Sequence, residues 1–388
     1  MTAIFRRDPG MGATSALTTT SSSTHINGIE ERTKTVWERI KLFIGGYIRD
    51  NFFWALNSLT SEAQRNMLQE ETAFFRDFWD RSVPFSPRWP ERREIIDTFT
   101  KKETSLDVNT SQRITVDCCS IEVEGVDMRE PHYNFVVAMG NLSNIRNNIT
   151  GVYPFIKAYL AKRREDPTIP PARFILISQY DLKQGGTSYK PETIDQAGQI
   201  LGSTLSSLHE KYGPIHQLVG HSLGAIVMGA ALKHINRSHL PRNIYFDRGP
   251  SSIYEASKNK LGGSILYQLA RVSGWDIDLG KEISEFCGSH PELPSIVISG
   301  VKKDHHFPGS AALTQSPRIT RLATESTLDV VEFDFPGQDV HEMAQHNIGN
   351  DELNGYNLLP RDIERSRFSL GIEESMAQAI IARSLPLP

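Results

Sequence analysis

Short apolar runs alternate with stretches of helical spacing over most of this chain, from about residue 111 onwards. The runs cover residues 134–139, 173–180, 215–219, 243–246, 295–299 and 330–335. Residues 113–126 alternate between apolar and polar side chains and predict two short extended segments. Near-continuous apolar strands separated by helices are typical of a parallel sheet covered on both faces. The pattern therefore predicts an α/β fold with a mostly parallel sheet.

Residues 29–82 have helical spacing instead. Apolar side chains recur there at three- and four-residue steps: Val36, Ile40, Phe43, Ile44, Tyr47 and Ile48, and later Leu68, Phe74, Phe75, Phe78 and Trp79. Lys41 and Arg49 make the first stretch too polar to span a bilayer. We favour packing of this stripe on the chain's own core, and the alternative is peripheral contact with a membrane surface or a partner. Because prolines follow at 84, 87 and 90, residues 29–110 are predicted to be a helical extension and linker.

The first 28 residues contain a Ser/Thr run but no apolar segment of the kind a signal peptide needs. They are predicted to be a disordered tail. We expect a cytoplasmic protein, or one exported without a standard signal peptide. The three cysteines make no disulfide framework. The net charge of −4 gives no reason to expect nucleic acid as a partner.

The segment Gly220-His221-Ser222-Leu223-Gly224 carries the strongest chemical signal. It follows an apolar strand and precedes a helix of small apolar residues. A sharp strand-to-helix turn of the form Gly-x-Ser-x-Gly exposes the serine hydroxyl at the sheet edge, so Ser222 is the predicted nucleophile. The alternative is a tight turn in which Ser222 only caps the helix.

Polar residues follow the other apolar runs, and carboxyl ends of parallel strands collect at one edge of a sheet. An acyl-transfer site needs two N–H donors for the oxyanion. One is predicted at Leu223, directly after the serine, and the other at Asn141 in the loop after residues 134–139. The alternative for Asn141 is an ordinary Gly-Asn turn.

A catalytic serine also needs a base and a carboxylate that orients it. Asp304, after residues 295–299, is the predicted acid, and Asp247 is its rival. His341, after residues 330–335, is the predicted base, with His346 as the alternative. The adjacent His305 and His306 have too few further ligands for a zinc site, so no metal or cofactor is expected.

The order Ser, Asp, His resembles that of the α/β-hydrolase superfamily. Over residues 111–388 the chain is similar to that superfamily in three segments: Gly140 to Ile145, Tyr180 to Ser188, and Gly220 to Gly224. Met139 stands where one branch has histidine, the glycine pattern of the second segment is altered, and Ala225 replaces a common glycine. Residues 246–252 resemble uncharacterised hydrolase-like proteins of chlamydiae and Legionella-type bacteria. The resemblance implies a hydrolase domain over 111–388 with a small helical cap at about 253–293.

These observations predict a serine hydrolase that cleaves an ester or thioester of a small-molecule or lipid acyl substrate. The alternative is a non-catalytic binding protein on the same fold, for example an exported bacterial effector.

Overall fold

A computed structural model describes part of the chain. The described residues are 35–48, 99–123, 132–138, 149–177, 182–258, 263–290, 294–301, 307, 309–325, 328–333, 377, 378 and 381.

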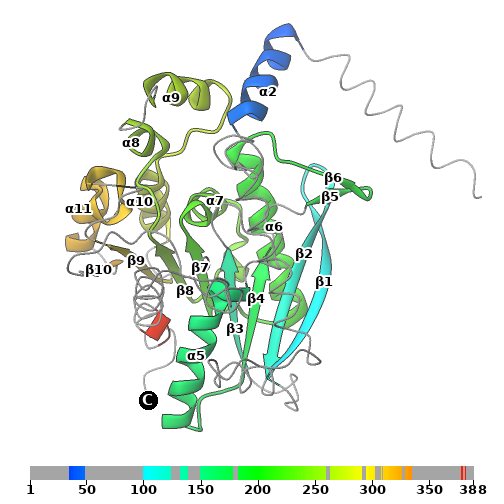
Figure 1. Ribbon diagram of the computed structural model, residues 1–388, viewed down its shortest axis with the longest axis vertical. Coiled ribbons are helices and arrows are strands. Elements are labelled where there is room, and N and C mark those ends of the chain that lie inside the picture. Colours follow the sequence, from blue (N-terminus) through cyan, green and yellow to red (C-terminus); the bar gives the residue numbers. More distant parts are fainter. Residues whose placement is uncertain are drawn as a thin grey trace, which may run out of the picture.

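Within these residues, ten strands form one sheet at the centre of the molecule (Figure 1). The strands are β1 (Phe99–Asn109), β2 (Arg113–Val123), β3 (Tyr133–Ala138), β4 (Ala172–Ile177), β5 (Lys183–Gln184), β6 (Thr187–Ser188), β7 (Gln217–His221), β8 (Asn243–Asp247), β9 (Ser295–Val301) and β10 (Leu328–Phe333). Their order is β10-β9-β8-β7-β3-β4-β2-β5-β6, and β1 pairs with β2. Neighbours from β10 to β4 run parallel, whereas β2 runs antiparallel to β4.

Helices cover both faces of this sheet (Figure 1). They include α5 (Ile149–Glu165), α6 (Ile194–Tyr212), α7 (Leu223–Ala231), α10 (Leu279–Ser289) and α11 (Pro317–Glu325). Helices α6 and α7 pack so closely that a Cβ at Gly198 would lie 2.6 Å from the Ala230 backbone. The buried apolar strands and these helices form the main core. The predicted α/β fold, with a mostly parallel sheet between helices, is therefore confirmed.

The structure differs from the sequence prediction at the start of the sheet. Strand β1 lies ahead of residue 111, where the hydrolase domain was predicted to begin, and it pairs with β2 along its whole length. Residues 113–123 form the single strand β2, so the prediction of two short segments was wrong. No glycine or proline interrupts these residues, so nothing in them forces a turn.

Helix α2 (Val36–Ile48) is the described part of the predicted N-terminal extension. Thr35 starts it with a capping box, because its hydroxyl accepts from the Glu38 N–H and its own N–H donates to the Glu38 carboxylate. The predicted cap region contains α8 (Ile253–Lys258), α9 (Gly263–Val272) and α10. Helix α2 packs against α9, and α10 packs against α7. None of the described helices is long and apolar enough to cross a membrane.

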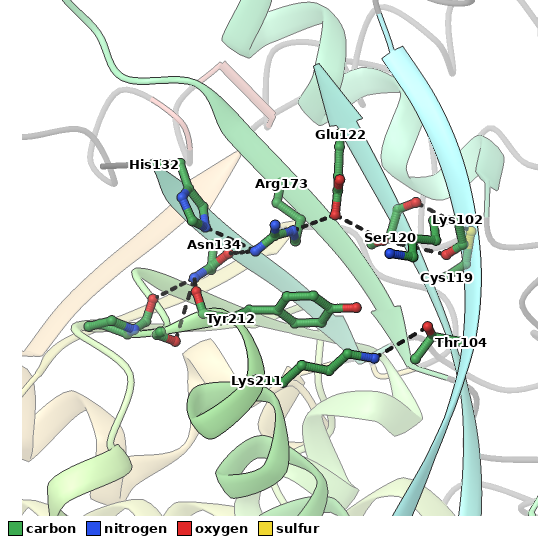
Figure 2. Close-up of polar contacts among 12 residues, drawn as sticks. Lys102, Thr104, Cys119, Ser120, Glu122, His132, Asn134, Arg173, Lys211 and Tyr212 are labelled. Atoms are coloured by element: carbon green, nitrogen blue, oxygen red, sulfur yellow. Dashed lines mark hydrogen bonds and ion pairs between the residues drawn. The ribbon is translucent and has the colours of Figure 1, made fainter. Parts of the chain in front are cut away.

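A polar network lies at the amino ends of β3 and β4 (Figure 2). The buried Arg173 donates from Nε to Glu122 at 2.7 Å and from Nη1 to Asn134 Oδ1 at 3.2 Å. Its guanidinium lies 4.2 Å from the centre of the Tyr212 ring. Because β3 and β7 are parallel, this network and Ser222 lie at opposite ends of the strands: the network is at the amino ends, and Ser222 follows the carboxyl end of β7. It ties β2, β3, β4 and the end of α6 together.

Candidate active site

The predicted strand-to-helix corner is present at Ser222. Strand β7 ends at His221 and α7 begins at Leu223, so a single residue makes the turn. Ser222 has φ 52° and ψ −119°, a conformation that costs a non-glycine residue about 1–3 kcal/mol. Its N–H donates to the Asp247 carbonyl at 2.9 Å, which ties the corner to the end of β8. The protein therefore maintains a strained backbone at the predicted nucleophile.

The Ser222 hydroxyl makes no capping hydrogen bond to α7, although Ser222 is the N-cap residue. The interpretation of Ser222 as an ordinary helix cap is therefore wrong. The side chain is half-buried. Leu223 is the first residue of α7, where N–H groups have no acceptor within the helix. A serine hydroxyl and helical N–H donors thus occupy neighbouring positions, as acyl transfer requires.

A row of buried polar residues lies at the carboxyl ends of β7, β8 and β9. The strand register pairs His221 with Asp247 and Asp247 with Ser299. His221 Nδ1 lies 2.8 Å from Asp247 Oδ2, and the Ser299 hydroxyl donates to Asp247 Oδ1 at 2.8 Å. All three side chains are buried. The row therefore fixes the end of β7, directly before the serine, to two neighbouring strands.

Arg248 completes this row from the residue after β8. It has φ 47°, and its N–H donates to the Ser299 carbonyl at 2.9 Å. Its buried guanidinium donates to both oxygens of Asp247. Burial alone would raise the pKa of Asp247, but the charge of Arg248 and the hydrogen bond with His221 lower it well below the ordinary range. Asp247 is therefore a carboxylate at every ordinary pH.

The structure places some predicted site residues and leaves others outside its description. Ser222, Leu223 and Asp247 are described, and they meet at the carboxyl ends of β7 and β8. The predictions that lie outside the described residues are Asn141, Asp304, His341 and His346. The strands that precede them are described: β3 is next to β7, β9 is next to β8, and β10 is next to β9.

Sequence reasoning missed three members of the row, His221, Arg248 and Ser299. Each stands at or just after the end of an apolar run in the sequence, and this position was the available signal. Their partnership with Asp247 depends on the register between strands that are far apart in sequence. In the described part of the chain, no group of three or more His, Cys, Asp or Glu side chains could hold a metal ion.

No family model matches this chain, and no curated protein matches it. Several solved structures are distantly similar. An esterase of Pyrococcus furiosus is 12% identical with a TM-score of 0.46, over 78% of this chain and 96% of that one. An esterase of the bacterial hormone-sensitive lipase family is 14% identical with a TM-score of 0.45, over 88% and 98%. Brefeldin A esterase, a bacterial homologue of human hormone-sensitive lipase, is 13% identical with a TM-score of 0.41, over 87% and 93%.

Proposed function

We propose that this protein is a serine hydrolase that cleaves an ester or thioester of an acyl substrate through an acyl-enzyme. The observation that carries the proposal is the corner at Ser222. It combines a strained backbone, a hydroxyl that does not cap the following helix, and a buried polar row behind it. A protein gains no stability from such a corner, since the strain costs free energy. Strain of this kind is a feature of active sites.

In the proposed reaction, the Ser222 oxygen attacks the acyl carbonyl carbon and its proton passes to His341, or to His346 in the alternative. The N–H groups of Leu223 and Asn141 stabilise the oxyanion. The protonated base then gives its proton to the leaving alcohol or thiol, and an acyl-serine ester remains. Water attacks this ester and gives a proton to the base. The base returns that proton to the Ser222 oxygen as its bond to the acyl carbon breaks, which releases the carboxylic acid and restores the serine hydroxyl. No cofactor takes part.

We assign the role of orienting the base to Asp304 rather than to Asp247. Both oxygens of Asp247 already accept hydrogen bonds, Oδ2 from His221 and Arg248 and Oδ1 from Ser299 and Arg248. A further histidine would have to displace one of these buried donors, which costs about 1–3 kcal/mol for each donor left without an acceptor. Asp304 follows β9 within three residues.

Labelling by a fluorophosphonate probe tests the proposed nucleophile. We expect the full chain to be labelled and Ser222→Ala to lose labelling completely, because the probe reacts only with an activated serine. Ser264→Ala, at an exposed position of α9, is the matched control and keeps full labelling. Intact, folded protein that resists the probe would support the alternative of a non-catalytic binding protein.

Four variants separate the remaining roles, with hydrolysis of a soluble short-chain ester as the readout for three of them and thermal unfolding for Asp247→Asn. We expect His341→Ala and Asp304→Asn to lower kcat by about 10³-fold or more. His346→Ala is expected to leave kcat almost unchanged. Asp247→Asn is expected to lower the melting temperature, since it removes the charge that balances the buried Arg248. A large loss of kcat in His346→Ala, with full activity in His341→Ala, would assign the role of the base to His346 instead of His341.

A further inference from the structure

The large apolar side chains that are exposed in the described residues all lie on three helices. They are Val36, Trp37, Ile40, Phe43 and Tyr47 on α2, Tyr254 on α8, and Ile265 and Val272 on α9. Helix α9 packs against both α2 and α8, and the three helices lie together at one end of the molecule (Figure 1). We call these eight side chains the apolar end surface. Exposed apolar side chains gathered at one place mark an interaction site more often than scattered ones do.

Helix α2 presents its apolar side chains as a stripe. Val36, Ile40, Phe43 and Tyr47 follow one another at steps of four, three and four residues, which places them on one face. Phe43 is 79% exposed and Val36 is 76% exposed. The helix is attached to the body by other residues, because Gly45 and Ile48 are buried. The exposed stripe is therefore additional to the apolar contacts that hold α2 in place.

Basic residues border this stripe. At 100° per residue, Trp37 widens the exposed apolar face to about 120°, and Arg39 and Lys41 lie about 40° beyond its two sides; both are exposed. The three helices carry four basic residues, Arg39, Lys41, Lys258 and Arg271, against two acidic residues, Glu38 and Glu255. The whole chain, in contrast, has a net charge of −4. The apolar end surface is thus a locally basic part of an acidic protein.

We propose that the apolar end surface binds to the surface of an anionic lipid bilayer. An exposed apolar stripe with basic residues on both borders matches acyl chains in the middle and anionic headgroups at the sides. Trp37 and Tyr47 are the amphipathic aromatic residues that favour the membrane–water interface. A second copy of the chain would bring like charges of both copies together, which disfavours a dimer through this surface.

Flotation of the full chain with lipid vesicles tests the proposal. We expect binding to vesicles of phosphatidylcholine with phosphatidylserine, and much weaker binding to phosphatidylcholine alone. The double variant Ile40→Ser/Phe43→Ser is expected to lower the partition coefficient about tenfold or more. The conservative variant Ile40→Val/Phe43→Leu keeps the apolar stripe and is expected to keep binding. Ile265→Ser on α9 tests the same surface from a second helix.

The charge is tested in parallel. Neutralising Arg39→Gln/Lys41→Gln is expected to weaken binding to the anionic vesicles about tenfold or more, since anionic headgroups attract both basic side chains. The control Lys281→Gln/Arg321→Gln removes the same charge from α10 and α11 and is expected to change binding little. Circular dichroism and fluorophosphonate labelling, which need no membrane, identify any variant that fails to fold.

Three results would overturn the proposal. The full chain could fail to float with anionic vesicles. The wild type, the serine variant and the glutamine variant could all float to the same extent. Sedimentation could instead show a dimer in the wild type that Ile40→Ser/Phe43→Ser converts to a monomer, which would assign the apolar end surface to a second copy of the chain.

Discussion

Gly220 shows how a single missing Cβ shapes the corner that holds Ser222. A Cβ at residue 220 would lie 3.0 Å from the Ala225 Cα and 3.1 Å from its nitrogen. These are backbone atoms of α7, so they can move away only if the start of the helix moves. The small residue is therefore needed for α7 to begin directly after the serine.

We predict that Gly220→Ala destabilises the protein by about 1–3 kcal/mol and reduces probe labelling of Ser222, because the start of α7 must shift. Thermal unfolding and labelling measure the two effects. Gly288→Ala in α10 is the matched control, since no atom lies within 4 Å of its Cβ position. There the added methyl group is expected to be neutral or slightly stabilising. Equal behaviour of the two variants would contradict this account of Gly220.

Protonation of His216 makes the stability of the protein depend on pH. Its Nδ1 accepts the Asn134 N–H at 3.1 Å, and the ring packs edge-on against Tyr133. Burial, then the charges of Arg242 and His132, lower the pKa of His216 to about 4. The native state thus holds a neutral imidazole, whereas the unfolded chain binds a proton at an ordinary histidine pKa of about 6.5.

The sign of the effect follows from this difference. Between about pH 6.5 and pH 4 the unfolded state binds more protons, so stability falls as the pH is lowered through this window. We predict that His216→Gln removes roughly 1 kcal/mol of the loss seen between about pH 7 and pH 5, after allowance for solvent screening. Urea unfolding at the two pH values measures it. A variant with the same pH dependence as the wild type would refute this role.

At the scale of elements, ion pairs between strands differ in what they contribute. Arg173 on β4 and Glu122 on β2 form a mostly buried pair, with side-chain exposures of 6% and 17%. Arg113 and Asp107 form a pair between β2 and β1, with exposures of 74% and 44%. We predict that Arg173→Met lowers the free energy of unfolding by about 3 kcal/mol, because it removes the buried guanidinium that balances the charge of the partly buried Glu122.

The matched variant Arg113→Met is expected to cost less than about 1 kcal/mol, since exposed ion pairs contribute little. Chemical denaturation of both variants measures the difference. Similar losses in the two variants would show that burial does not determine the contribution of these pairs.

The central strands could be predicted from the sequence because each is an apolar run buried on both faces. Strand β4, with every residue buried, is the clearest example. Strand β1 could not be predicted in the same way. It pairs with β2 near the edge of the sheet, and only Leu106 and Val108 are buried among its described side chains. A strand with one polar face gives no continuous apolar run.

The candidate site likewise has one part that the local sequence predicts and another part that it does not. The corner at Ser222 depends on five consecutive residues, so local sequence was enough to predict it. The contacts of Asp247 with His221 and Ser299 depend on the register of β7, β8 and β9. Register between distant strands is set by packing of the whole sheet, and no local pattern encodes it. The roles of Asn141, Asp304 and His341, together with the expected location and bacterial resemblance, stay predictions.

At the scale of the whole molecule, helices α2, α8 and α9 form a helical end, which is attached to the α/β body through buried contacts. Trp275, just after α9, is fully buried, and its Nε1–H donates to the Glu192 carbonyl at 2.9 Å. The Gly274 carbonyl accepts from Ile194, the first residue of α6. A Cβ at Gly45 of α2 would lie 3.3 Å from the Ser273 Cβ. Helices α2, α9 and α6 therefore meet around residues 273–275.

This arrangement predicts how the molecule opens when Trp275 is truncated. Trp275→Ala removes a large buried ring and a hydrogen bond, which costs about 3–5 kcal/mol. Because the ring lies where α2, α6 and α9 meet, we expect amide protection to fall most in α2 and α9 and least in β7 and β8. Hydrogen exchange with mass spectrometry measures this. Trp275→Phe keeps most of the ring and should lose much less protection. If protection instead fell equally in every element, the helical end and the body would unfold as one unit, and the apolar end surface could not open independently of the site at Ser222.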